Sequence, residues 1–86
     1  MTRITLLTQD TCTFCDQAKG VLARLAAEHP LDIEEIPLDT PQGQALAVEN
    51  GVMFAPGVLV DGKSFSHGRL SEKKLRRRLE QRTGRS

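Results

Sequence analysis

The hydrophobic residues of the chain gather into short runs and helical stripes that turn residues separate. An apolar run rich in β-branched residues at positions 3–8 predicts a buried strand. In the next segment, apolar residues stand at offsets of 4, 7, 8 and 11 from the first, which is the spacing of one helix face. This stripe predicts an amphipathic helix from Phe14 to about Glu28, and Pro30 prevents its continuation. The residues on the predicted face are Phe14, Ala18, Val21, Leu22 and Leu25.

The middle of the chain carries the signals of a second strand and a second helix. Residues 32–39 predict a strand, and Pro37 places it at a sheet edge, because proline has no N–H for a strand ladder. A short helix is predicted from Pro41 to about Asn50, since Thr40 suits the N-cap and proline suits the first helical position. The apolar residues assigned to these two elements are Ile33, Ile36, Leu38, Leu46 and Val48.

A hairpin and a last helix complete the pattern. Residues 58–60 and 64–67 flank Asp61-Gly62, a dipeptide that supplies the positive φ of a two-residue turn between antiparallel strands. Ser71 can cap a final helix. The apolar residues of that helix and of the hydrophobic staple at its start are Leu70, Leu75 and Leu79.

The predicted elements follow one another in the order βαβαββα within one domain, residues 1–86. A short crossover makes the first two strands parallel, and the hairpin adds two antiparallel strands. The sequence therefore predicts an α/β fold, a four-stranded mixed sheet with helices on both faces. In such folds, sites gather at the carboxyl ends of strands and the amino ends of helices.

Length and composition limit the class of protein. A chain of 86 residues and 9.5 kDa supports one core and no large enclosed cavity, so we expect a site in a surface groove. We expect Phe54 and Phe65 to contribute to packing. No apolar run approaches the roughly 20 residues of a membrane span, and no leader pattern opens the chain. Two cysteines are too few to staple a secreted mini-domain. We therefore expect a cytoplasmic monomer that does not bind membranes.

Charge divides the chain into two unlike parts. Residues 1–62 hold three basic and nine acidic side chains, a balance of −6, whereas residues 63–86 hold nine basic and two acidic ones, a balance of +7. The basic last helix is either a solvated face or a docking surface for an acidic partner. Nucleic acid is not an expected partner, because the chain has no Tyr or Trp to stack on bases. The helix carries Lys73, Lys74, Arg76, Arg77, Arg78 and Arg82.

The segment Cys12-Thr13-Phe14-Cys15 lies between the first predicted strand and the first turn of the helix. Residues three apart are helix neighbours with Cβ atoms about 5–6 Å apart, so two sulfurs at this spacing can form and release a disulfide. Cys12 at the N-cap faces unpaired N–H groups and the positive end of the helix dipole, which stabilise a thiolate. Cys15 points into the first turn. We therefore predict Cys12 as the nucleophile and Cys15 as the resolving thiol.

With this motif, the chain resembles the glutaredoxin and thioredoxin superfamily over nearly its whole length. The shared pattern is a strand, Cys12-x-x-Cys15, a helix, then Phe54-Ala55-Pro56 and a turn at Gly68. The resemblance implies a glutaredoxin-like fold and a cis Ala55-Pro56 peptide bond beside Cys12. A proline at that rim leaves the backbone of Ala55 free to pair with an extended substrate peptide.

The chain departs from the glutaredoxin pattern at three places. Thr13-Phe14 replaces the Pro-Tyr common between the two cysteines. Asp10 and Asp16 stand where many glutaredoxins have a nearby basic residue, and their charges oppose formation of the Cys12 thiolate. Glutathione-using members continue with Gly-Gly, an aromatic residue and Ser/Thr-Asp, whereas residues 68–72 here read Gly-Arg-Leu-Ser-Glu.

The predicted function is dithiol–disulfide exchange that reduces disulfide-containing proteins through a Cys12–Cys15 couple. No bound cofactor or metal is expected, and electrons come from glutathione or a thioredoxin-type reductase. The reductase is favoured, because Arg69 occupies the position of the second glycine. The predicted substrate-binding residues are Thr13, Phe14, Ala55, Pro56, Gly68, Arg69 and Ser71.

The alternative function is a metal-binding module. The two cysteines could hold zinc with His29 and His67 as further ligands. The family resemblance also allows an iron–sulfur cluster shared across a dimer.

Overall fold

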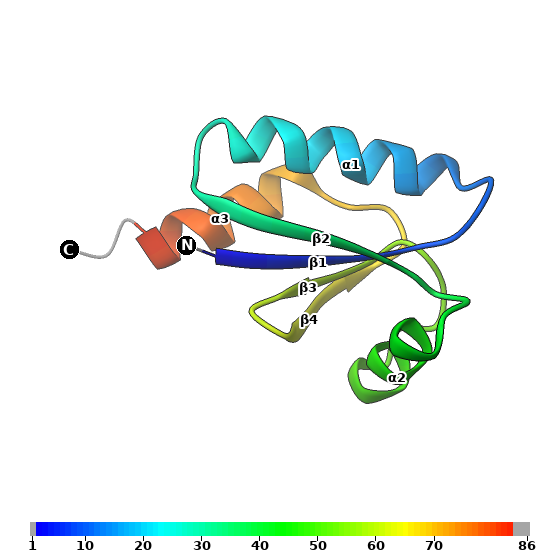
Figure 1. Ribbon diagram of the computed structural model, residues 1–86. Coiled ribbons are helices and arrows are strands. Elements are labelled where there is room, and N and C mark those ends of the chain that lie inside the picture. Colours follow the sequence, from blue (N-terminus) through cyan, green and yellow to red (C-terminus); the bar gives the residue numbers. More distant parts are fainter. Residues whose placement is uncertain (1, 84–86) are drawn as a thin grey trace.

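The computed structural model describes residues 2–83 and has the predicted order of elements (Figure 1). The elements are β1 (Thr2–Thr8), α1 (Thr13–Ala26), β2 (Leu31–Pro37), α2 (Pro41–Asn50), β3 (Gly57–Val60), β4 (Lys63–His67) and α3 (Glu72–Thr83). Two boundaries differ by about two residues from prediction: α1 ends at Ala26 and not near Glu28, and β2 ends at Pro37 and not at Asp39. No helix among residues 2–83 has the length and apolar character to cross a membrane.

The sheet is mixed, as predicted, with strand order β2-β1-β3-β4. β1 pairs with β2 in parallel and with β3 antiparallel, and the β3–β4 hairpin adds the outer strand. β2 is the other outer strand, which agrees with the edge position expected from Pro37. The carboxyl end of β1 and the amino end of β3 meet at one end of the sheet, where Leu7 is opposite Gly57.

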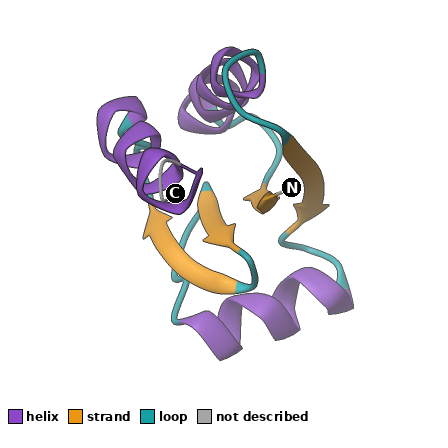
Figure 2. Ribbon diagram, turned by 90° about the vertical axis from the view of Figure 1, so that its left-hand side faces the viewer, coloured by secondary structure: helices purple, strands orange, loops and turns teal. Residues whose placement is uncertain are grey.

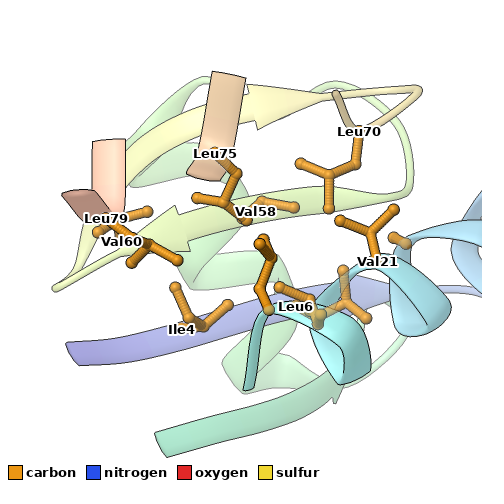
Figure 3. Packing of buried hydrophobic residues seen from close by; sticks show 11 residues of the cluster. Ile4, Leu6, Val21, Val58, Val60, Leu70, Leu75 and Leu79 are labelled. Atoms are coloured by element: carbon orange, nitrogen blue, oxygen red, sulfur yellow. The ribbon is translucent and has the colours of Figure 1, made fainter. Parts of the chain in front are cut away.

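Helices cover both faces of the sheet, with α1 and α3 on one side and α2 on the other (Figure 2). The larger cluster lies beneath α1 and α3, and Figure 3 shows its side chains converging from both helices and the central strands. It contains Ile4, Leu6, Ala18, Val21, Leu22, Leu25, Val58, Val60, Leu70, Leu75 and Leu79. A smaller cluster beneath α2 contains Leu7, Ile36, Val52 and Leu59.

Local signals explain where the helices begin and end. Thr40 caps α2 by accepting the Gly43 N–H at 3.0 Å, and Gly51 ends that helix with a φ of 67°. Ser71 accepts the Lys74 N–H at 3.2 Å and so caps α3 as predicted. Helix boundaries in this chain therefore follow its cap residues closely.

The β3–β4 hairpin turns at Asp61 and Gly62, whose φ angles are 52° and 84°. The turn is also tied to β1, because the Asp61 N–H donates to the Arg3 carbonyl at 2.8 Å. A bulge in the ladder leaves Phe65 as an extra residue between the pairs Val58–Ser66 and Leu59–Ser64. Phe65 packs against the larger cluster, which confirms its predicted packing role.

Three apolar side chains lie further out than predicted. Phe14 is 50% exposed, and Cys15 takes its place on the buried face of α1, because both residues fit the helical spacing and only one can face the sheet. Val48 is 82% exposed, since α2 meets the sheet mainly through Leu46 and Ala47. Phe54 is 52% exposed and lies outside both clusters, because it precedes β3 in the connecting loop.

Candidate active site

Cys12 and Cys15 form a disulfide at the start of α1, with Cα atoms 5.1 Å apart. Cys12 is the N-cap residue, and its Sγ accepts the Cys15 N–H at 3.0 Å. Its side chain is partly exposed, whereas Cys15 is only 2% exposed. The predicted N-cap position is therefore confirmed, and the two sulfurs differ in access and in contact with backbone N–H groups.

Thr11 redirects the chain from β1 into the N-cap. Its φ is 54°, in the left-handed region that β-branched residues rarely occupy. A residue held there costs about 1–3 kcal/mol, which the surrounding structure must offset. Nothing in the sequence pattern predicted this conformation. Thr11 and the flanking Asp10 are both exposed, so this turn lies at the molecular surface.

The segment Ala55-Pro56 lies at the same end of the sheet as the cysteines, immediately before β3 (Figure 1). The Ala55-Pro56 bond is cis, as the family resemblance implied, and Pro56 is buried. The Gly68 N–H donates to the Pro56 carbonyl at 2.8 Å, which joins the turn after β4 to this segment. Within residues 2–83, the backbone groups of Ala55 make no hydrogen bond. Ala55 therefore presents free backbone polar groups beside the motif-bearing end of the sheet.

An aromatic side chain covers the joined loops. Phe54 packs against Gly68, where a Cβ would lie 3.0 Å from the Phe54 ring, and the His67 ring meets it edge-on at 5.1 Å. With Phe14 half-exposed in the first turn of α1, this end of the molecule presents two accessible aromatic rings. Phe54 was not predicted as a site residue, although its position directly before Ala55-Pro56 in the sequence could have indicated this role.

A groove of about 420 Å³ runs between α1 and the start of α3. Two predicted site residues, Arg69 and Ser71, line it together with Glu72 and the α1 residues Gln17 and Arg24. Neither cysteine lines this groove. The Gln17 Oε1 atom is buried without a hydrogen-bond partner among the described residues. Sequence reasoning did not single out Gln17.

Glu72 is held by arginines rather than left as an isolated negative charge. Its carboxylate pairs with Arg24 at 2.8 Å and Arg76 at 3.0 Å, and Arg76 also pairs with Glu28 at 2.9 Å. The hydrogen bonds from Arg24 lower the pKa of Glu72 below its ordinary value, and those from Arg76 lower the pKa of Glu28. We call these four residues the α1–α3 ion network. Arg76, counted among the basic docking residues from sequence, belongs to this network instead.

The described residues contain no group of three or more His, Cys, Asp or Glu side chains arranged to hold a metal ion. The zinc alternative needed both histidines beside the cysteines. His67 instead contacts Phe54, and His29 follows the end of α1, at the helix terminus opposite Cys12. Within residues 2–83, the two cysteines therefore have no third His, Cys, Asp or Glu side chain placed to share a zinc ion with them.

Comparisons with known proteins support the same family and fold. Residues 3–80 match the family model "Glutaredoxin-like domain (DUF836)". A protein described as "Probable Thioredoxin" from Archaeoglobus fulgidus is 28% identical over 76 residues, which are 88% of this chain and 84% of that protein.

Two solved structures have a similar fold. A point mutant of thioredoxin from Halobacterium salinarum has a TM-score of 0.72 and 25% identity, with 93% of this chain and 73% of that chain covered. A thioredoxin-like protein from Clostridium perfringens has a TM-score of 0.78 and 17% identity, with 100% and 74% covered. The mixed sheet with helices on both faces is thus a thioredoxin fold, and the chain belongs to the glutaredoxin-like domain family.

Proposed function

We propose that this protein is a thiol–disulfide oxidoreductase that reduces protein disulfides through Cys12 and Cys15. The Cys12 thiolate attacks one sulfur of a substrate disulfide, and the other substrate sulfur leaves as a thiolate and takes up a proton. Cys15 then loses its proton and attacks the Cys12 sulfur, which releases the second substrate thiol. Two electrons and two protons pass to the substrate, and the Cys12–Cys15 disulfide remains.

The observation that carries this proposal is the unequal environment of the two sulfurs. Cys12 is partly exposed, and its Sγ accepts a backbone N–H at the positive end of α1. Cys15 is buried behind it, at the spacing that an intramolecular attack on Cys12 requires. An exposed, stabilised thiolate paired with a shielded neighbour suits the two-step exchange.

Substrate binding in this proposal uses the loops beside the cysteines. The free backbone groups of Ala55 can pair with an extended peptide, in the manner of an added strand. Thr13, Phe14 and the Gly68 turn would flank that peptide. The physiological setting that fits this function is a reducing cytoplasm, with the protein acting as a monomer.

The test compares two matched variants, Cys12→Ser and Cys15→Ser, in reduction of a protein disulfide. We expect Cys12→Ser to abolish exchange, because no accessible thiolate remains to attack. We expect Cys15→Ser to accumulate a mixed disulfide on Cys12, detectable as a mass increase equal to the bound substrate. Faster alkylation of Cys15 than of Cys12 in the reduced wild-type protein would contradict the assignment.

The electron donor is tested on the oxidised protein, with glutathione and a thioredoxin-type reductase supplied separately. We favour the reductase, because the Arg69 side chain extends where a second glycine would let glutathione approach closely. Glu72 does not oppose a glutathione carboxylate strongly, since the arginines of the α1–α3 ion network neutralise it. Rapid reduction by glutathione and none by the reductase would reverse this preference. Metal analysis of anaerobically purified protein tests the metal-binding alternative in parallel.

A further inference from the structure

A second groove of about 420 Å³ lies between the outer strand β4 and the side of α3 that faces away from α1. Phe65 and Ser66 line it from β4, and the bulge in the hairpin ladder explains how two consecutive residues both face α3. The charged residues of its lining are all basic: Arg69, Lys74, Arg77 and Arg78. We call this surface the basic groove.

The cations of the basic groove have no acidic partners within residues 2–83. Arg69, Lys74, Arg77 and Arg78 take part in no ion pair there, whereas Arg24 and Arg76 are neutralised in the α1–α3 ion network. The helix α3 is therefore two-sided, with its charge compensated toward α1 and uncompensated toward the basic groove. A concave surface with four unpaired cations concentrates anions and raises the rate at which they associate.

The guanidinium of Arg78 stacks over the Phe65 ring at 5.0 Å from its centre. Stacking uses the flat face of the guanidinium, so its N–H groups are held in a fixed plane and point outward from its edge. This geometry suits bidentate hydrogen bonding to a carboxylate. It also covers one face of the only aromatic ring that lines the groove.

The basic groove continues toward the proposed exchange site. Arg69 lines both this groove and the groove beside α1, and it follows Gly68, whose N–H holds the Pro56 carbonyl. A polypeptide that pairs with the backbone of Ala55 would therefore have this basic surface within reach.

We propose that the basic groove docks an acidic segment of the protein substrate and so selects substrates with carboxylates near the target disulfide. This inference rests on the proposed function. A polypeptide fits better than a nucleic acid, because the chain has no Tyr or Trp to stack on bases. Phe65 is a poor substitute, since Arg78 covers one face of its ring and the side chain packs against the larger cluster. Residues 1–62 carry a balance of −6, which repels a long polyanion but not a short acidic segment confined to the groove.

The experiment compares reduction of two peptide disulfides that differ only in flanking residues, one with glutamates and one with serines. The double variant Lys74→Glu/Arg77→Glu reverses two groove cations and spares Arg78, which packs on Phe65. A matched control, Lys63→Glu/Lys73→Glu, changes net charge equally at exposed residues outside the groove. We expect the groove variant to slow reduction of the acidic peptide about tenfold, to flatten its salt dependence, and to leave the serine peptide unchanged.

Equal slowing in the groove variant and the control would overturn the proposal, because net charge alone would then explain the preference. Equal rates for the two peptides with the wild-type protein would also overturn it.

Binding of a cysteine-free acidic peptide separates this inference from the proposed function, since it needs no exchange chemistry. We expect that peptide to bind the wild-type protein and the control at low salt, and the groove variant about tenfold more weakly. Tighter binding of a single-stranded oligonucleotide of the same charge would assign the groove to nucleic acid instead. If the wild-type protein reduced neither peptide disulfide but still bound the cysteine-free acidic peptide, the oxidoreductase function would be refuted and the docking role of the basic groove would stand.

Discussion

Gly68 shows how one residue holds two parts of the candidate site together. Its φ of 84° is a conformation that side-chain-bearing residues rarely adopt, and the Phe54 ring lies where a Cβ would project. Its N–H also donates to the Pro56 carbonyl. The position therefore combines a backbone requirement, a packing requirement and a hydrogen bond next to the proposed substrate-binding loop.

We predict that Gly68→Ala lowers the free energy of unfolding by about 1–3 kcal/mol, because alanine is strained at this φ and must displace Phe54. Urea denaturation measures the change. Gly20→Ala is the matched control, since Gly20 lies within α1 and its Cβ would meet only the Arg24 side chain at 3.6 Å. That control should gain up to about 1 kcal/mol from helix propensity. Equal effects of the two substitutions would show that Gly68 has no special role.

Residue-level predictions succeeded where the signal was local and failed where two residues competed for one position. The placement of Cys12 at the N-cap follows from the motif and the helix start alone. Phe14 was expected both on the apolar face of the helix and beside Cys12 at the site, and it is half exposed. Cys15, three residues before Ala18, also fits the helical spacing and is the one that is buried. Periodicity defines a stripe, but its edge is set by the angle at which the helix meets the sheet.

At the scale of elements, α1 and α3 are joined by ion pairs between residues far apart in sequence. Arg24 pairs with Glu72, and Glu28 pairs with Arg76. Only the Glu72–Arg76 pair, at i and i+4 on one helix, was visible as a pattern in the sequence. The other two depend on how the helices lie side by side, which no local rule specifies.

The α1–α3 ion network predicts that the free energy of unfolding decreases at acidic pH. The arginines lower the pKa of Glu72 in the folded state, so the ionised Glu72 side chain stabilises the fold. This stabilisation is fully present above the ordinary carboxyl pKa of 4.5 and is lost as the pH falls through the lower pKa of the folded state. Glu72→Gln should therefore unfold more easily than wild type at pH 7, and the difference should shrink toward pH 3. Urea denaturation across this range measures it. Glu80→Gln, which removes an exposed carboxylate from the same helix, is the matched control for the loss of one negative charge.

At the scale of the whole molecule, the fold was predictable because each element carries its own signal. Caps, turns and periodicity gave the element order, and the crossover and hairpin rules then fixed the strand directions. The two grooves and the two-sided charge of α3 were not predictable, because they depend on which helix face meets a neighbour. The charge imbalance was visible in the sequence. Which of the basic residues form ion pairs and which do not could be seen only in the tertiary structure.

The larger hydrophobic cluster should dominate stability. Leu79 is fully buried where α3 packs on the sheet, so Leu79→Ala should cost about 2–5 kcal/mol. The free energy of unfolding of a domain of this length is roughly 4–13 kcal/mol in total, so the variant should have a much lower melting temperature in thermal denaturation. Val48→Ala is the control, because that side chain is exposed and its loss should change stability by no more than about 0.5 kcal/mol. A similar loss in both variants would contradict the assignment of the core.

The hydrogen bond from the Cys15 N–H to the Cys12 Sγ gives the protein a reporter of its own chemistry. The electron density on that sulfur differs among a thiol, a thiolate, a mixed disulfide and the Cys12–Cys15 disulfide. The amide proton bonded to the sulfur must respond to each of these forms. A single backbone resonance in a ¹⁵N-labelled sample would therefore follow both the ionisation of the nucleophile and its turnover, with no added dye or coupled enzyme.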